Sequence, residues 1–198
     1  GPRTARINQD IIDIISRAID LGQLPSNIQI LVSVHPNSDP ELFENNKHVV
    51  TVRKSSQYFS DSRLSDMEFT PEWRQWLLDM IYHSSVTVNS QGTMSIDAAA
   101  LDRPVVNIAF DGYLKLPYHQ SVARLYDLDH YKAIIESKGV RIAYNKEELI
   151  KCIGEYLEDP TLDRSGRARI VREQVAFSDG SSAYQMARHV LRLFDLKS

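Results

Sequence analysis

The sequence predicts an α/β fold, in which a Rossmann-like parallel sheet of about five strands carries helices on both faces. Short runs rich in β-branched residues alternate along the chain with amphipathic segments, which is the order of parallel strands joined by helices. The segment from 85 to 110 is the clearest unit. It contains a strand, a turn of small residues, an Ala-rich helix and a second strand in succession.

The composition fits one globular domain and excludes several classes of protein. Of 198 residues, 42% are hydrophobic and 25% are charged, which suffices to bury a core. With 23 basic and 26 acidic residues, the chain has no overall positive field that would attract nucleic acid. The single cysteine, Cys152, cannot form an internal disulfide and is expected to pack within a helix. No apolar run reaches about 20 residues and no signal peptide is recognised, so we expect no transmembrane segment.

The first part of the chain predicts one helix and two strands. Isoleucines at helical spacing in Asn8–Leu21 predict an amphipathic helix, which Gly22 ends. The nearly continuous apolar run Ile28–Val34 predicts a strand that is covered on both faces. Val49–Val52 predicts a second strand, and the polar residues 54–70 predict a long loop.

Capping signals and apolar runs locate the remaining elements. Thr70 is the expected N-cap of a helix, because a proline and an acid follow it. Asn145 is expected to cap a helix through Leu157, with Glu148 in the capping-box position. The other predicted elements are strands at Val86–Asn89, after Arg103-Pro104 and at Val140–Ala143, and helices from about Tyr131, from Pro160 and over Ser181–Phe194.

We divide the chain at residue 26. Residues 1–26 are interpreted as a tag remnant and an amphipathic linker helix, because Gly1-Pro2 resembles the pair that a protease leaves after tag removal. Residues 27–198 are interpreted as the Rossmann-like domain. On this interpretation the chain is a piece of a longer protein.

The loops that follow the strands are the expected ligand site, because ligands of open parallel sheets lie outside the carboxyl ends of the strands. His35 ends the first predicted strand, Ser90–Thr93 follow a later one, and Asp111 and Gly112 follow the next. These residues are distant in sequence, but the topology predicts that they share one edge.

The turn formed by Ser90, Gln91, Gly92 and Thr93 is predicted to bind phosphate. Backbone N–H groups at the start of a helix lack partners and lie at its positive end, so they favour an anion. Gly92 would permit close approach, and the hydroxyls of Ser90 and Thr93 would add donors. The competing interpretation is an ordinary helix cap, for which serine and threonine are common.

Further positions complete the predicted site. Asp97, one helical turn after Thr93, would accept hydrogen bonds from ribose hydroxyls, or would only stabilise the helix dipole. His35 would donate to phosphate or serve in acid/base chemistry, or would be a surface histidine. Asp111 and Gly112, with the aromatic loop after them, would line a sugar or base pocket, or would form a plain turn.

Two other groups of residues are expected to be structural. Trp73 and Trp76 lie three apart on an amphipathic helix and are expected to pack in the core or against another domain. The arginines of the segment after Pro160 are expected to form a solvated helix face, with phosphate recognition as the alternative. They are Arg164, Arg167, Arg169 and Arg172.

The combination of motifs resembles a known family. HPNS after a strand, then HSSVTVNSQGTMSIDAAALDRPVVNIAFDG, then YLEDP and FSDGSSA are similar to the C-terminal, donor-binding half of GT-B glycosyltransferases of bacterial surface-polysaccharide type. Related patterns occur in polyol-phosphate transferases of teichoic-acid type and in UDP-N-acetylglucosamine 2-epimerase. The resemblance runs from about Ile28 to the C-terminus and is strongest from Ser84 to Gly112.

The resemblance implies a glycosyltransferase of surface-polysaccharide or glycoconjugate biosynthesis, which transfers a sugar from a nucleotide-activated donor. Ser90, Gly92 and Thr93 would contact the donor phosphates. Asp97 would take the place of the ribose-binding acid, where many relatives have glutamate, and His35 would be the catalytic residue near the leaving group. The donor would be a UDP-, CDP- or CMP-linked sugar. The nucleotide stays open because the histidine-proline and serine motifs also resemble those of bacterial sialyltransferases, which use CMP-sugars.

The same resemblance implies neither a cofactor nor a metal, since GT-B enzymes generally stabilise the departing phosphate with helix N-termini and side chains. A glycan or lipid-linked acceptor would bind through an N-terminal half outside this chain, which alone is expected to bind donor weakly and turn over little. We expect a cytoplasmic protein, and attachment to the inner face of the membrane stays open. A noncatalytic binding or interaction module and an epimerase-like protein are the alternatives.

Overall fold

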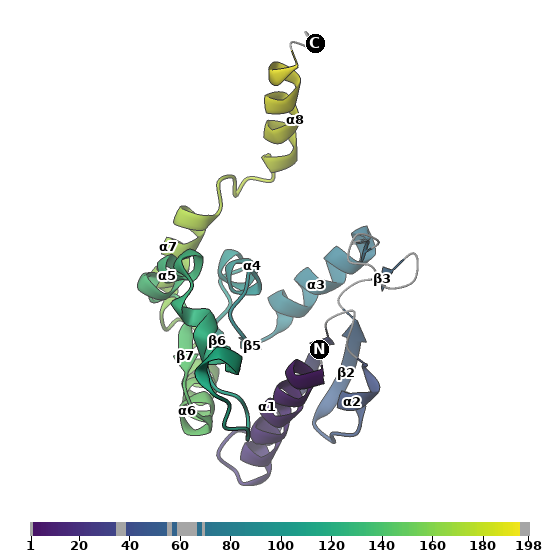
Figure 1. Cartoon of the computed structure of the whole chain (residues 1–198), viewed down its shortest axis with the longest axis vertical. Coiled ribbons are helices and arrows are strands. Elements are labelled where there is room, and N and C mark those ends of the chain that lie inside the picture. Colours follow the sequence, from purple (N-terminus) through teal and green to yellow (C-terminus); the bar gives the residue numbers. More distant parts are fainter. Residues whose placement is uncertain (1, 35–38, 55–56, 59–66, 69, 195–198) are drawn as a thin grey trace.

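The structure is a computed structural model that describes residues 2–34, 39–54, 57–58, 67–68 and 70–194. It is mixed α/β, and helices and short strands follow one another along the chain (Figure 1). His35, the predicted catalytic residue, lies outside the described residues.

The elements follow the predicted alternation of strands and helices. The strands are β1 (Ile30–Val34), β2 (Val49–Lys54), β3 (Gln57–Tyr58), β4 (Met67–Glu68), β5 (Thr87–Asn89), β6 (Val105–Ile108) and β7 (Arg141–Ala143). The α-helices are α1 (Pro2–Asp20), α2 (Glu41–Glu44), α3 (Pro71–His83), α4 (Met94–Ala100), α5 (Asp129–Ser137), α6 (Lys146–Glu158), α7 (Arg164–Gln174) and α8 (Ser182–Leu193). The 3₁₀ helices η2 (Tyr118–Gln120) and η3 (Val122–Asp127) lie between β6 and α5.

The parallel strands form two separate sheets. β1 pairs with β2, and β5, β6 and β7 form a three-stranded sheet in that order. The described residues contain no hydrogen-bonded ladder between β1 and β5, and β5 offers only three residues for one. Parallel strands joined by helices are therefore confirmed, whereas one continuous sheet of about five strands is wrong. In the segment predicted as a loop, β3 and β4 form a short antiparallel pair.

The β1–β2 pair is less covered than its apolar sequence predicts. Leu31 in β1 is 43% exposed, and Val50 in β2 is 50% exposed. The prediction that Ile28–Val34 is covered on both faces is therefore wrong. Without β5 beside it, β1 lies at the margin of the packed region, where its outward side chains remain accessible to solvent.

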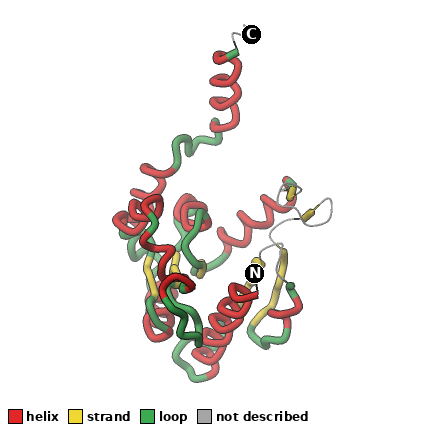
Figure 2. The backbone as a smooth tube through the Cα atoms, in the orientation of Figure 1, coloured by secondary structure: helices red, strands yellow, loops and turns green. Residues whose placement is uncertain are grey.

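Helices cover both faces of the three-stranded sheet (Figure 2). Val106 and Ile108 of β6 belong to a hydrophobic core that includes α1 and α6. Val105 points the other way, because side chains alternate along a strand, and belongs to a second core with α3, α4, α5 and α7. Every residue of β6 is buried. This arrangement is the predicted layering of helices on two faces.

Helix α1 is an integral part of the first core. It begins at Pro2 rather than at the predicted Asn8, and it buries an apolar stripe against β6, β7 and α6. The division of the chain at residue 26 stays a prediction, but this helix packs as a core element does. The buried residues of the stripe are Ile7, Ile11, Ile14, Ile15, Ala18 and Ile19.

Two predicted helix caps are confirmed. Thr70 Oγ1 accepts a hydrogen bond from the backbone N–H of Trp73 at 3.2 Å. Asn145 Oδ1 accepts one from the backbone N–H of Glu148 at 2.9 Å. Glu148 returns the interaction one residue earlier than a standard capping box, since it accepts from the backbone N–H of Tyr144 at 2.8 Å.

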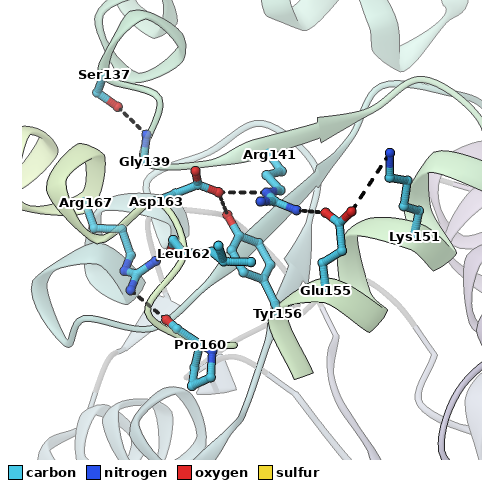
Figure 3. Close-up of polar contacts among 10 residues, drawn as sticks. All are labelled: Ser137, Gly139, Arg141, Lys151, Glu155, Tyr156, Pro160, Leu162, Asp163 and Arg167. Carbon is cyan, nitrogen blue, oxygen red and sulfur yellow. Dashed lines mark hydrogen bonds and ion pairs between the residues drawn. The ribbon is translucent and has the colours of Figure 1, made fainter. Parts of the chain in front are cut away.

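Helix α7 is held by a backbone contact between two glycines. A Cβ on Gly139 would lie 2.4 Å from the carbonyl carbon of Gly166, and a Cβ on Gly166 would lie 2.4 Å from the backbone nitrogen of Gly139. Ser137 Oγ accepts from the Gly139 N–H at 3.0 Å and holds this turn (Figure 3). Only glycine allows the two backbones to approach this closely.

Arg167 is buried, with 1% of its side chain exposed, so the prediction that it lies on a solvated helix face is wrong. Its Nε donates to Asp102 Oδ1 at 2.9 Å, its Nη1 to the Leu162 carbonyl at 2.6 Å and its Nη2 to the Pro160 carbonyl at 2.9 Å. A guanidinium can be buried because these acceptors satisfy its donors. Figure 3 shows this side chain directed at Pro160.

A second arginine ties β7 to α6 and to the start of α7. Arg141 Nε donates to Asp163 Oδ2 at 2.7 Å, and its Nη1 pairs with Glu155 (Figure 3). Tyr156 lies beneath the guanidinium, 4.6 Å from ring centroid to Cζ, and its hydroxyl donates to the same carboxylate of Asp163 at 2.8 Å. These contacts fix the turn from which α7 begins.

The glycine contact predicts a sharp difference between two Gly→Ala substitutions. Gly139→Ala should lower the free energy of unfolding by about 1–3 kcal/mol or more, because its methyl group would overlap the backbone of Gly166. Gly154→Ala is the matched control: on α6 the nearest atom to its Cβ would be 3.8 Å away, and alanine favours the helix by about 1 kcal/mol. Urea unfolding measures both. Equal effects would show that the glycine contact does not hold α7.

Candidate functional site

The predicted phosphate-binding turn follows the carboxyl end of β5 and leads into α4. Ser90 and Thr93 are exposed, and Gln91 and Gly92 are partly exposed. In this position the turn lies at the edge where ligands of parallel sheets usually bind.

The four backbone N–H groups around the turn differ in their partners. Those of Thr93 and Met94 have no protein acceptor within the described part of the chain. Those of Gln91 and Gly92 are directed at the hydroxyl oxygens of Tyr126 and Tyr131, respectively. Two amides of the turn thus lie close enough to tyrosine hydroxyls to lower the pKa of those phenols, and two have no protein acceptor among the described residues.

The turn is not closed by a capping side chain. Thr93 is the N-cap of α4, yet its hydroxyl makes no capping hydrogen bond, and its backbone is already in the helical region at φ −64° and ψ −20°. The ordinary-cap interpretation of this turn therefore finds no support in its hydrogen bonds. The first amides of α4 stay unsatisfied by the protein.

A buried polar cluster lies beneath the turn. Asn107, in the middle of β6, is fully buried, and its Oδ1 accepts from Ser95 Oγ of α4 at 3.1 Å. Its Nδ2 donates to the hydroxyl of Tyr131 on α5, which also lies 2.9 Å from Ser95 Oγ. Burial raises the pKa of Tyr131, and hydrogen bonds to its oxygen from Ser95, Asn107 and the Gly92 N–H counteract this rise. The phenol therefore remains neutral, and its hydroxyl links Asn107 of β6 with Ser95 of α4 beneath the turn.

Tyr126 packs beside Tyr131 in this buried cluster. Its ring meets that of Tyr131 edge to face with centroids 5.8 Å apart, and its hydroxyl donates to the carbonyl of Ile108 at 2.7 Å. Burial raises the pKa of Tyr126 as well. Neither tyrosine was predicted from the sequence to lie at the site. The only signal in the sequence was the polar Asn107 inside an apolar strand, which requires buried partners from somewhere.

Asp97 is an exposed carboxylate on α4, with no hydrogen bond or ion pair to any described residue. Desolvation by nearby protein atoms raises the pKa of its carboxyl above the ordinary value. The side chain therefore has acceptor oxygens that the protein itself does not use.

Asp111 and Gly112 have close contacts within the protein. Asp111 is buried, and its Oδ1 accepts from the backbone N–H of Val122 at 2.8 Å. Gly112 has φ +65°, and a Cβ there would lie 2.5 Å from Asp10 Cβ on α1. Asp10 also accepts from the backbone N–H of Tyr113 at 3.1 Å. The loop is thereby fastened to α1, and its predicted role in a sugar or base pocket stays a prediction.

The neighbouring aromatic residue is fastened to α1 in the same way. The Tyr113 hydroxyl donates to Asp13 Oδ2 at 2.7 Å, and burial together with this hydrogen bond raises the pKa of Tyr113 to about 12. On the other side of the turn, Gln91 Nε2 lies 3.0 Å from Nε2 of His130 at the start of α5. His130 is the described histidine that adjoins the turn.

Other features of the described residues lie away from the turn. A hollow of about 180 Å³ between α1 and α2 is lined by Gln9, Ile12, Leu42, Phe43, Asn45 and Asn46. The described residues contain no group of three or more His, Cys, Asp or Glu side chains placed to hold a metal ion. No helix among them has the length and apolar character needed to cross a membrane.

No protein-family model, curated protein or solved structure matches this chain.

The buried cluster predicts that Tyr131→Phe is destabilising. Removing the hydroxyl leaves the buried Asn107 Nδ2 without its acceptor, which should cost about 1–3 kcal/mol in the free energy of unfolding. Tyr144→Phe, at a side chain that is 59% exposed, is the control and should be within about 0.5 kcal/mol of the native chain. Urea unfolding compares the two. A neutral Tyr131→Phe would mean that the cluster does not support the turn.

The raised pKa of Asp97 predicts a pH-dependent effect of Asp97→Asn. The folded state binds the Asp97 proton more tightly than the unfolded state, so the carboxyl contributes most favourably below its unfolded pKa and loses this contribution as pH rises through its folded pKa. Relative to the native chain, the variant should therefore be more stable at pH 7 than at pH 4. Urea unfolding at the two pH values measures this difference, and a difference of opposite sign would contradict the assignment.

Proposed function

We propose that the chain is the donor-binding part of a glycosyltransferase and that the turn from Ser90 to Thr93 binds the phosphate of a nucleotide-activated sugar. The observation that carries the proposal is the pair of unpaired backbone N–H groups at Thr93 and Met94, in an exposed turn after a parallel strand. Such groups have strong affinity for an anion, and phosphate oxygens are acceptors of suitable charge.

Asp97 supports a nucleotide rather than a bare phosphate. Its carboxylate is exposed and has no partner among the described residues, and it lies one helical turn beyond the free amides. Ribose hydroxyls would donate to it while the phosphate occupies the turn. The desolvation that raises the pKa of Asp97 is a cost that such donors would relieve.

The family resemblance supplies the rest of the proposal. His35 would assist the departing phosphate, Asp111 and Gly112 would border the sugar or base, and neither a metal nor a cofactor would be needed. The acceptor, a glycan or a lipid-linked precursor, would be held by a part of the protein outside this chain. The protein would act in the cytoplasm in surface-polysaccharide or glycoconjugate biosynthesis.

A noncatalytic binding or interaction module is the second candidate, and one observation favours it. The backbone N–H groups of Gln91 and Gly92 already face Tyr126 and Tyr131, which leaves fewer donors for a diphosphate than an open turn would offer. A module that has lost nucleotide binding would show this arrangement too.

Titration calorimetry with UDP, CDP and CMP tests the proposal. We expect weak, saturable binding of at least one nucleotide, abolished by Thr93→Arg because the longer side chain would fill the space above the amides. Ala100→Arg is the control, since this exposed position at the far end of α4 lies away from the turn, and it should bind as the native chain does. Absence of binding by all three nucleotides would favour the noncatalytic module. Robust glycosyl transfer by the chain alone would show that the acceptor site is not elsewhere.

A further inference from the structure

Helix α8 stands apart from the rest of the protein. It projects away from the sheets and their covering helices, with the C-terminal end of the chain at its far tip (Figure 1). Every residue from Ser182 to Phe194 is exposed except Gln185, which is partly buried. The other long helices bury at least one residue each, so α8 alone among the described helices of eight or more residues has no buried face.

The sequence of α8 nevertheless has a strong apolar face. At 100° per residue, its apolar side chains cover about half of the helix circumference, and its polar side chains cover the other half. The large apolar side chains are unusually accessible: Met186 is 71% exposed, Leu193 69% and Phe194 71%. Tyr184, Val190 and Leu191 complete this face. A helix that exposes such a face to water loses the hydrophobic stabilisation that its pattern offers.

The polar face of α8 is entirely basic or neutral. It carries Arg188, His189 and Arg192, and the segment from Ser181 to Phe194 contains no aspartate or glutamate, although acids outnumber basic residues in the chain as a whole. Within the described residues neither arginine of α8 forms an ion pair. Arg188 lies over the ring of Tyr184 at 5.6 Å, at the border between the two faces.

The arginines of α7 make the contrast clear. Arg167 and Arg164 both pair with Asp102, and Arg169 pairs with Glu173. Three of the four arginines of α7 thus form ion pairs within the protein, whereas neither arginine of α8 does so among the described residues. Helix α8 presents both an unmatched apolar face and unmatched positive charge.

We infer that α8 binds the surface of an anionic lipid membrane and lies in the plane of that surface. A planar interface divides a helix into an apolar half and a polar half, which is the division found in α8, whereas a helix that packs on the core of a globular protein needs an apolar stripe of only about 100°. The acyl region would receive the apolar half, and anionic headgroups would receive Arg188 and Arg192. At twelve residues the helix is too short to cross the bilayer, so it would lie on it.

This inference is independent of the nucleotide site, because no residue of α8 belongs to that site. Helix α8 would dock on the membrane whatever the turn after β5 binds. Helix α7 is anchored by Gly166 and Arg167, so the linker of residues 175–181 would connect a firmly packed body to a membrane-bound helix.

Vesicle co-sedimentation of the whole chain tests the inference. We expect binding to vesicles of phosphatidylcholine with about one third phosphatidylglycerol and little binding to phosphatidylcholine alone. About 0.5 M salt should weaken the binding by screening. Hydrogen exchange of the α8 amides should slow when anionic vesicles are added, while the exchange of α6 should not change.

Paired variants separate the two contributions of α8. Arg188→Gln with Arg192→Gln should lower the partition coefficient about 25-fold, because each arginine near an anionic surface contributes about fivefold. The double substitution of both arginines by lysine keeps the charge and should retain binding. Leu193→Ser should lower partitioning about tenfold. Leu21→Ser, at a leucine of similar exposure (73% against 69%) beyond the end of α1, should have no effect.

The remaining outcomes overturn the inference. Failure of the native chain to bind anionic vesicles at low salt would rule out a membrane surface. Equal binding of the Leu193→Ser and Leu21→Ser variants would show that α8 is not the contact. Concentration-dependent dimerisation in sedimentation velocity that Leu193→Ser abolishes, without vesicle binding, would assign the apolar face to a second copy of the chain. Circular dichroism verifies that each variant is folded.

Discussion

The need of one buried amide for hydrogen-bond partners organises the three-stranded sheet and its helices. Asn107 lies in the central strand β6 with apolar neighbours on both sides, where an unpaired amide would cost several kcal/mol at worst and about 1–3 kcal/mol in a typical protein. Its partners come from two different helices, Ser95 of α4 and Tyr131 of α5. This requirement fixes the positions of both helices on the same face of the sheet. The start of α4 is thereby tied to the cluster, because Ser95 bonds to both Asn107 and Tyr131.

Helix α7 is held in place in a different way from α4 and α5. This helix covers the core formed by α4 and α5, yet its sequence is rich in arginine and poor in large apolar residues. Hydrogen bonds and a close backbone contact hold this helix, instead of a large buried apolar area. Arg167 satisfies carbonyls of the preceding turn and a carboxylate at Asp102, while Gly166 allows its backbone to touch that of Gly139. The anionic partner at Asp102 lies at the end of α4, so the helix that begins at the candidate site is held at its other end by α7.

Local signals in the sequence predicted the helix caps and the buried strand, but they could not predict which strands pair or which distant side chains meet. The caps at Thr70 and Asn145 could be predicted because each depends on residues within four positions, and the apolar run of β6 identified a fully buried strand. The split between β1 and β5 could not be predicted, because no local pattern says which strands share hydrogen bonds. Burial of Arg167 depends on Asp102, sixty-five positions earlier. At the candidate site, the turn and Asp97 were evident from the sequence. The tyrosines beneath the turn, Tyr126 and Tyr131, come from a distant segment and carry no signal of that position.

The contact of Gly139 with Gly166 has a consequence for recognising kin of this chain. A position where any side chain would collide with main-chain atoms admits a single amino acid, irrespective of what the molecule binds or does. A chain with the same backbone contact would need glycine at both places, even if it bound another ligand or lacked the turn after β5. Glycines at these two places thus form a sequence marker of this backbone contact, which is set by architecture and not by function.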